Sequence, residues 1–214
     1  MYKLFTAILI ILGFSLQAQP SLKGGLDSYV QNNKIYPNYS LANCITGTVN
    51  IAFKLNTKGF AYYSEVRNGV GTDLDDEALR LIRMSNGKWI VPADYDTATV
   101  ILAPINFKLT DCIGRSAQEV KAAIEAYKAN IDLTNAVLNY YRAKEQGKAP
   151  GITEGKVLEL KDALGYDDSY LAQRLQNGKK KLKQNDKQGA CEDFKFVKYM
   201  GSNAADELLN QYCK

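Results

Sequence analysis

The feature that most constrains the fold is a clean alternation of apolar and polar residues over Thr48–Leu55. Val49, Ile51, Phe53 and Leu55 fall on one face of an extended chain, and the polar or small residues between them fall on the other, which is the pattern of a half-buried strand. Asn56–Gly59 then has the length and the glycine of a hairpin loop, and Phe60–Arg67 returns as the second strand. The segment predicts an antiparallel hairpin.

A helix is predicted over Thr72–Met84, directly after the hairpin. Thr72 and Asp75 have the spacing of a capping box, and an apolar stripe follows at helical spacing, made of Leu74, Ala78, Leu81 and Ile82. Acidic residues crowd the first turn and Arg80 and Arg83 lie near the end, as the helix dipole prefers. We therefore interpret the acidic cluster as a helix start and not as a metal site.

A third strand is predicted over Thr99–Leu109, which alternates again but contains Pro104. Because proline cannot donate to a ladder, this strand must lie at an edge, with that position facing solvent. A right-handed crossover through the helix makes the second and third strands parallel, so the first lies between them, in the order 2-1-3. That arrangement brings Cys44, before the first strand, close to Cys112, after the third, and predicts a disulfide between them.

The rest of the chain reads as helices, beyond a boundary near Cys112–Gly114. The sequence thus predicts an α+β fold, a three-stranded antiparallel sheet packed with helices, including one over Leu26–Asn33, followed by an all-α region. The helices expected there are Ala117–Ala129 with Ser116 and Glu119 as its cap, Leu133–Gln146, Glu154–Leu164, Asp168–Gln184, Gly189–Met200 and Asn203–Tyr212. Cys191 and Cys213 are the remaining pair and would join the last two helices.

The first residues have the pattern of an export signal, with Lys3 before an apolar block that ends in small and polar residues near Ala18. The alternative is a short membrane anchor, but the block is shorter than the roughly 20 residues that span a bilayer. We expect residues 1–18 to be a cleaved signal peptide, residues 26–112 to form the sheet domain and residues 116–214 the helical domain. Four cysteines in an exported chain favour two disulfides.

Several kinds of function are disfavoured by composition. The chain contains no histidine, which removes the commonest general base and transition-metal ligand. No phosphate loop, nucleophile elbow, dinucleotide fingerprint or metal-ligand spacing occurs, so we expect no catalysis, cofactor or metal. The net charge of +4 is spread along the chain, unlike a nucleic-acid footprint. The one basic cluster, Lys179–Lys183, is interpreted as a solvated helix face, with an acidic partner or a membrane surface as the alternative.

Six short motifs, in order and at matching spacing, resemble the C-terminal domain of TonB-family proteins. They are Tyr36-Pro37, Gly47-Thr48-Val49 with Phe53 and Gly59, Val66 to Gly71, Leu74 to Arg80, Lys88-Trp89 and Pro104 to Leu109. The resemblance covers about a third of the chain. It implies a periplasmic protein-binding domain that contacts a short segment of an outer-membrane transporter, through strand addition at an exposed sheet edge.

The chain departs from the family's energy transducers, which keep a membrane helix and a long proline-rich spacer. We therefore expect an exported TonB-like binding module of the cell envelope, linked to TonB-dependent transport, without an integral anchor after signal cleavage. Its partner would be an envelope protein such as an outer-membrane transporter segment, and no nucleic acid is expected. Because Pro104 interrupts the third strand, addition would use the stretch before it, Lys108 to Leu109 or the opposite edge. The predicted partner-binding residues are Ala98, Thr99, Val100, Leu102 and Lys108.

Two alternatives remain from the sequence. The stretch from Gly189 to Leu209 is similar to Sel1 and tetratricopeptide repeats, though it holds one or two units where a free-standing array needs three. A helical adaptor with the sheet domain as a structural cap is therefore a second hypothesis. A hydrolase is the third, and it requires a cleft that holds several carboxylates with perturbed pKa values.

Overall fold

The computed structural model describes residues 19–110, 112 and 114–213; the predicted signal peptide lies outside them. An antiparallel sheet of three strands dominates the first half, with β2 (Gly47–Leu55) between β3 (Ala61–Asn68) and β5 (Ile101–Phe107). The three antiparallel strands confirm the expectation. A separate two-stranded pair, β1 (Ser21–Leu22) with β4 (Trp89–Ile90), was not predicted, because two-residue strands carry no periodic signal.

One face of the sheet is covered by α1 (Leu26–Asn33) and α3 (Asp73–Met84), with the short α2 (Asn38–Ala42) before β2. The predicted bounds of α1 are confirmed, whereas α2 was missed. The apolar stripe of α3 meets the inward side chains of β2 and β5 in one core, whose fully buried members include Val49, Ile51, Phe53, Leu55, Leu74, Leu81, Ile82 and Ile105. Sequence alternation and helical periodicity therefore meet in a single layer of packing.

The start of α3 differs from the predicted capping box. The Thr72 hydroxyl accepts from the Leu74 N–H at 3.4 Å. The Asp75 carboxylate turns away from Thr72 and accepts from the N–H groups of Val70 and Gly71, both at 2.9 Å. The aspartate side chain is one carbon shorter than glutamate, and it binds the loop before the helix instead of the N-cap residue. Asp75 therefore stabilises the first turn of α3 by fixing that loop.

The second half begins with α4 (Ala117–Glu145), a single helix of 29 residues. The prediction of two helices here was wrong, although the capping box of Ser116 and Glu119 is confirmed. The apolar residues of α4 do not form one continuous stripe, because its two ends pack in different cores. Val120, Ala123 and Ile124 pack on the sheet core, and Val137 and Tyr140 lie in a helical core. The exposed turn between them contains no glycine or proline, so nothing breaks the helix.

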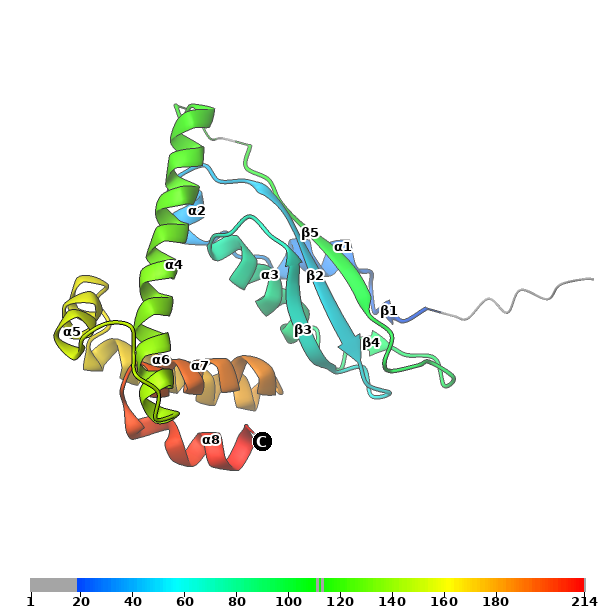
Figure 1. Ribbon diagram of the computed structural model, residues 1–214. Helices are drawn as coiled ribbons and strands as arrows, with labels where there is room; N and C mark the ends of the chain where they lie inside the picture. Colours follow the sequence, from blue (N-terminus) through cyan, green and yellow to red (C-terminus); the bar gives the residue numbers. More distant parts are fainter. Residues whose placement is uncertain (1–18, 111, 113, 214) are drawn as a thin grey trace, which may run out of the picture.

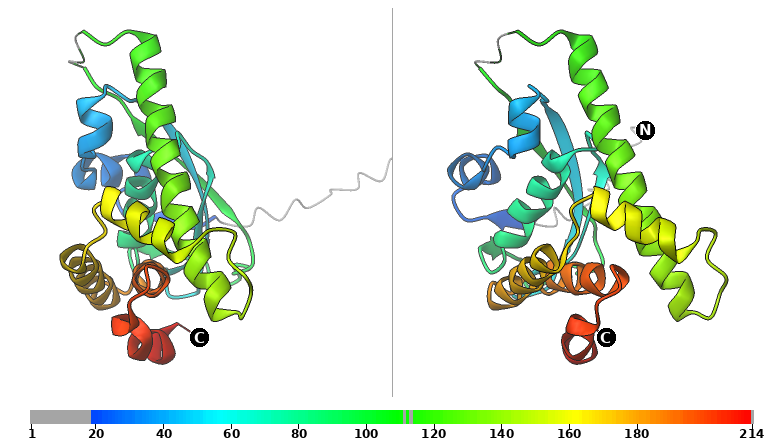
Figure 2. Two further views of the ribbon diagram at one scale, coloured as in Figure 1. Left: turned by 60° about the vertical axis from the view of Figure 1, so that its left-hand side comes forward. Right: turned by 90° about the vertical axis from the view of Figure 1, so that its left-hand side faces the viewer.

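The remaining helices gather at the far end of α4 (Figures 1 and 2). They are α5 (Glu154–Ala163), α6 (Asp168–Lys183), α7 (Lys187–Tyr199), the 3₁₀ turn η1 (Asn203–Ala205) and α8 (Asp206–Tyr212). Two small cores hold them: one joins α4, α5, α6 and Met200, and the other joins α7 to Ala205. The last segment, predicted as one helix, begins with the 3₁₀ turn.

Two disulfides are present. Cys44 bonds to Cys112, with 5.6 Å between their Cα atoms, across the end of the sheet where Gly47 pairs with Phe107. Cys191 in α7 bonds to Cys213 after α8, also at 5.6 Å. The first closes the sheet domain, and the second fastens the last helix to α7.

Two glycines inside helices give opposite predictions for substitution by alanine. A Cβ at Gly178 in α6 would lie 2.5 Å from the ring of the buried Phe194, whereas a Cβ at Gly155 in α5 would meet nothing within 4 Å. Gly155→Ala is expected to raise the free energy of unfolding by about 0.5–1 kcal/mol. Gly178→Ala should lower it by roughly 1–3 kcal/mol, because overpacking outweighs the gain in helix propensity. Thermal unfolding of the two variants checks this; equal stabilisation by both would contradict the tight contact.

Candidate functional site

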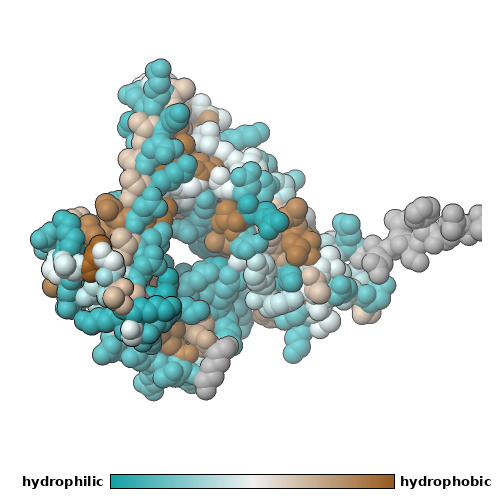
Figure 3. Space-filling model, viewed as in Figure 1, coloured by the Kyte–Doolittle hydropathy of each residue, from teal (hydrophilic) through white to brown (hydrophobic). Residues whose placement is uncertain are grey.

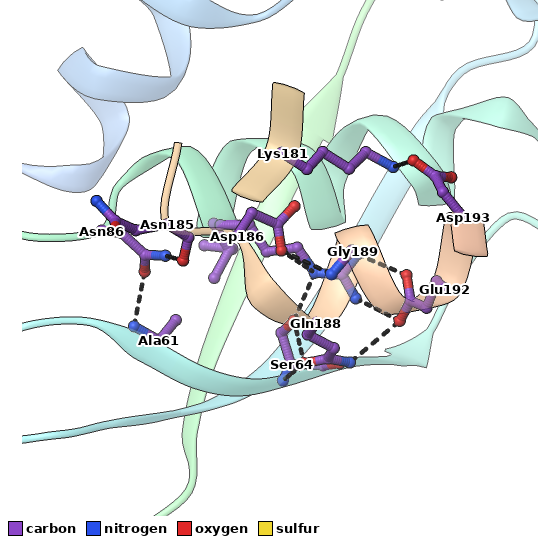
Figure 4. A network of polar contacts seen from close by, with 12 residues as sticks. Ala61, Ser64, Asn86, Lys181, Asn185, Asp186, Gln188, Gly189, Glu192 and Asp193 are labelled. Atoms are coloured by element: carbon purple, nitrogen blue, oxygen red, sulfur yellow. Dashed lines mark hydrogen bonds and ion pairs between the residues drawn. The ribbon is translucent and has the colours of Figure 1, made fainter. Parts of the chain in front are cut away.

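The sheet has two edges, β3 and β5, and they are in different states. At the β3 edge, the side-chain amide of Gln188 in α7 contacts both backbone groups of Ser64. Its Oε1 accepts from the Ser64 N–H at 2.8 Å, and its Nε2 donates to the Ser64 carbonyl at 2.7 Å. Beside it, Asn86 Oδ1 accepts from the Ala61 N–H at 2.7 Å, and its Nδ2 donates to the Asn185 carbonyl at 3.0 Å (Figure 4). The β3 edge is therefore occupied by side chains of α7 and of the turn after α3.

The β5 edge is more open, and its backbone directions follow from one contact. Lys34 Nζ donates to the Asn106 carbonyl at 3.1 Å, so this carbonyl points away from β2. Backbone groups alternate in direction along an antiparallel strand, and the β2–β5 register runs without a shift. Leu102, Pro104 and Asn106 therefore face the free edge, and Pro104 costs the ladder nothing.

Only part of this edge can accept a strand. Pro104 has no N–H, and the Asn106 carbonyl is engaged by Lys34. Leu102 is the residue within β5 that offers both an N–H and a C=O outward. An added strand would thus be confined to the N-terminal half of β5 and the residues before it.

A groove adjoins that half on the sheet face opposite α1 and α3. It has a volume of about 370 Å³ and is lined by Ala52, Lys54, Tyr63, Glu65, Arg67, Val100 and Leu102. Ala52 pairs with Leu102 on one side and Glu65 on the other, so a small side chain sits between larger ones. Leu102 is 63% exposed and Val100 is 50% exposed. Apolar side chains therefore lie in water next to an unpaired backbone.

The predicted partner-binding residues do not all come together. Val100 and Leu102 both line the groove. Ala98 and Thr99 lie in the preceding turn, where their N–H groups donate to the side chain and the backbone carbonyl of Asp96. Lys108 follows the opposite end of β5, roughly 20 Å from Leu102 at the rise of a strand. Sequence reasoning missed Ala52, Tyr63 and Lys34, which come to this region only through strand register and a long-range contact.

A second hollow, of about 400 Å³, separates α3 from α6 and α7. Figure 3 shows the molecule hollowed between α4 and α3. The lining is highly charged: Asp73, Asp76, Glu77, Asp186 and Glu192 face Arg80, Arg83, Arg174 and Lys181, with Ile35, Pro37 and Leu79 beside them. The surrounding protein raises the pKa of the Asp76 carboxyl group by desolvation, although this residue keeps an exposed surface. Burial is the largest cause that raises the pKa of the Asp186 carboxyl group. It also raises the pKa of Tyr127 in α4 to about 12, with Asp76 as the next contributor.

These carboxylates do not form an acid–base pair. Asp186 is the N-cap of α7 and accepts from the Gly189 N–H at 2.7 Å. Glu192 binds Arg83, and Asp73 accepts from the Tyr39 N–H. Asp76 is the carboxylate of the hollow that no hydrogen bond or ion pair reaches from the residues that the structure describes. One such carboxyl group, without a second free one, gives the hydrolase hypothesis little support.

Within residues 19–110, 112 and 114–213, no group of three or more acidic or cysteine side chains is placed to hold a metal ion. In the same part of the chain, no helix has the length and apolar character needed to cross a bilayer.

The fold defines a class, that of a small α+β domain with a three-stranded antiparallel sheet, one edge of which is covered by side chains and the other of which is open. Residues 32–109 match the family described as the Gram-negative bacterial TonB protein C-terminal. This match confirms the resemblance seen in the motifs, and it covers the sheet domain without the helical region. No curated protein and no solved structure matches the chain.

Proposed function

We propose that this protein is an exported component of the bacterial envelope that binds an extended segment of another protein at the β5 edge. One observation carries the proposal. The backbone groups of Leu102 that face the free edge lie beside the exposed apolar side chains of Leu102 and Val100. Strand addition draws affinity from main-chain hydrogen bonds and specificity from side-chain pockets, and both are offered here.

The covered β3 edge supports the same choice of site. Gln188 and Asn86 hold backbone groups that an incoming strand would need. Pro104 and Lys34 limit the length available on β5. A short edge of this kind suits a short segment and discourages sheet-to-sheet aggregation.

The family match supports an envelope partner, and we propose a segment of an outer-membrane transporter, met in the periplasm after signal cleavage. We do not propose energy transduction. The proposed binding needs the sheet domain alone, and the helical region contributes by closing the other edge.

The test is capture of partners from a bacterial envelope extract by residues 19–214. Capture of outer-membrane transporters or their plug segments is expected. Leu102→Pro removes the outward N–H of the residue in β5 that offers both backbone groups, and the fold tolerates it because Pro104 already occupies an equivalent outward position. We expect it to weaken capture by at least about tenfold, since each lost backbone hydrogen bond contributes roughly 1 kcal/mol and pairing beyond it is interrupted.

Leu102→Thr is the matched control, because it keeps the N–H and the strand propensity but loses the apolar side chain. It should retain more binding than Leu102→Pro. Transporter capture that is equal in wild type and Leu102→Pro would refute addition at this edge. Repeated failure to capture any transporter, with a TonB C-terminal domain as positive control, would refute the partner.

A further inference from the structure

The contact between α7 and β3 is polar, and within it the Gln188 side chain takes the place of a neighbouring strand. Gln188 presents an acceptor and a donor to the N–H and C=O of one residue, as a neighbouring strand does. Next to it, Arg83 in α3 donates to both carboxylate oxygens of Glu192 at 2.7 and 2.8 Å. The Asn86 to Asn185 contact adds a third link. Each link runs between the sheet domain and the helical region.

We propose that the helical region is a cover for the β3 edge, and that it keeps two copies of this protein from pairing through that edge. An uncovered edge strand offers a row of unpaired backbone groups to another chain. Here the Ser64 groups point outward, since Gln188 reaches both of them. The sheet match ends at Leu109, so the cover is supplied by the part of the chain that the family does not include.

A second copy fits the covered edge by chemistry as well as by backbone. A two-fold axis through Ser64 would make the two Ser64 residues exchange both of their hydrogen bonds. It would also place Tyr63 opposite Glu65 of the copy, twice, on the exposed face. Within one chain the neighbouring Glu65 carboxylate raises the pKa of the Tyr63 hydroxyl. Across the axis, that hydroxyl donor would meet the carboxylate acceptor of the copy's Glu65.

The uncovered contact would be short. The register shifts at both ends of β3, between Asn50 and Ile51 and between Lys54 and Leu55 on the partner strand, leave Tyr63–Val66 as the regular stretch. Bulges of this kind weaken pairing at an edge. Self-association is therefore expected to be weak and concentration-dependent when the cover opens.

The experiment opens the cover in the full chain from residue 19. Gln188→Ala with Glu192→Arg removes the strand mimic and sets two arginines against each other at the joint. In samples too dilute to form dimers, amide exchange should become at least about tenfold faster at Ser64, since one lost hydrogen bond and an opened contact exceed about 1.4 kcal/mol. Sedimentation velocity should show dimers that wild type lacks at the same concentration. Lys187→Ala, at an exposed neighbour in α7, is the matched control and should change neither readout.

A blocking variant and a milder opening variant complete the test. Tyr63→Glu, added to the opened chain, should abolish the dimer while Ser64 stays exposed, because it sets a carboxylate opposite Glu65 of the copy, twice, and like charges directly opposite each other destabilise strand pairing. Gln188→Glu still accepts from the Ser64 N–H but cannot donate to its carbonyl, and should give intermediate exchange without unfolding. A monomer with fast Ser64 exchange would overturn self-pairing. Unchanged Ser64 exchange in both Gln188 variants would overturn the cover.

Discussion

Replacing Cys44 and Cys112 by alanine is expected to lower the free energy of unfolding of the sheet domain by about 4 kcal/mol. The bond closes a loop with a sequence separation of 68 residues, and the chain-entropy account of disulfides gives about that value for such a loop. The loss is large because it equals a substantial part of the 5–15 kcal/mol that typically separates folded from unfolded domains.

Denaturant unfolding followed by tryptophan fluorescence measures this loss. Trp89 is the single tryptophan of the chain, is buried, and lies 5.1 Å from Phe53 between ring centroids, so its signal reports the sheet core. The matched comparison is Cys191→Ala with Cys213→Ala, which opens a separation of 22 residues and should cost about 3 kcal/mol. Its effect should appear in the helical circular dichroism signal before the tryptophan signal. A sheet core equally stable without Cys44 and Cys112 would contradict the first prediction.

The sheet domain could be predicted from the sequence because its information is local. Val49, Ile51, Phe53 and Leu55 alternate in a segment buried on one face, and Leu74, Ala78, Leu81 and Ile82 repeat at helical spacing. The position of Pro104 indicated an edge strand, and Pro104 is exposed at the edge strand β5. Each of these signals is read within about ten residues.

The sequence did not predict the features that depend on contacts between segments far apart in the chain. The turn around Asn130 to Asp132 has no buried side chain, so its pattern resembles a gap between helices, although α4 is continuous. Gln188 contacts a residue 124 positions away, and a single glutamine carries no periodic signal. Lys34 reaches Asn106 across 72 positions. The candidate residues near Leu102 could be predicted because Pro104 marks β5 as an edge strand. That the β3 edge is covered by Gln188 could not be predicted.

The contrast between the two edges gives the helical region a physical role. One edge is left open beside apolar side chains, and the other is closed by polar groups from α7. If both edges were open, an extended segment could add at either of them, and the β3 edge could also pair with a second copy of the protein. Closing β3 therefore makes the proposed binding single-sited, and it explains why α7 contributes polar side chains where a core would use apolar ones.

Arg83→Leu is expected to lower the free energy of unfolding by about 3 kcal/mol, because it leaves buried acceptors without their cation. Arg83 is 6% exposed. Its Nε donates to Ser64 Oγ at 2.9 Å and lies 3.9 Å from Asp186 Oδ1, and its other nitrogens bind the half-exposed Glu192. Glu192 can regain water, but Asp186, which is 7% exposed, cannot. Most of the cost therefore arises at Asp186.

Two measurements separate this cause from loss of packing. In an Asp186→Asn background, where asparagine still caps α7, Arg83→Leu should cost less than half as much.

The loss of stability in Arg83→Leu should also depend on pH. Burial raises the pKa of Asp186, and Arg83 opposes that shift, so the pKa rises further in Arg83→Leu. A carboxyl group with a higher pKa in the folded state destabilises the fold above that pKa and ceases to do so where both states are protonated. The deficit of Arg83→Leu should therefore shrink as pH falls from 7 toward about 4, near the unfolded value. A deficit that is independent of pH and unchanged by Asp186→Asn would show that Arg83 acts through packing alone.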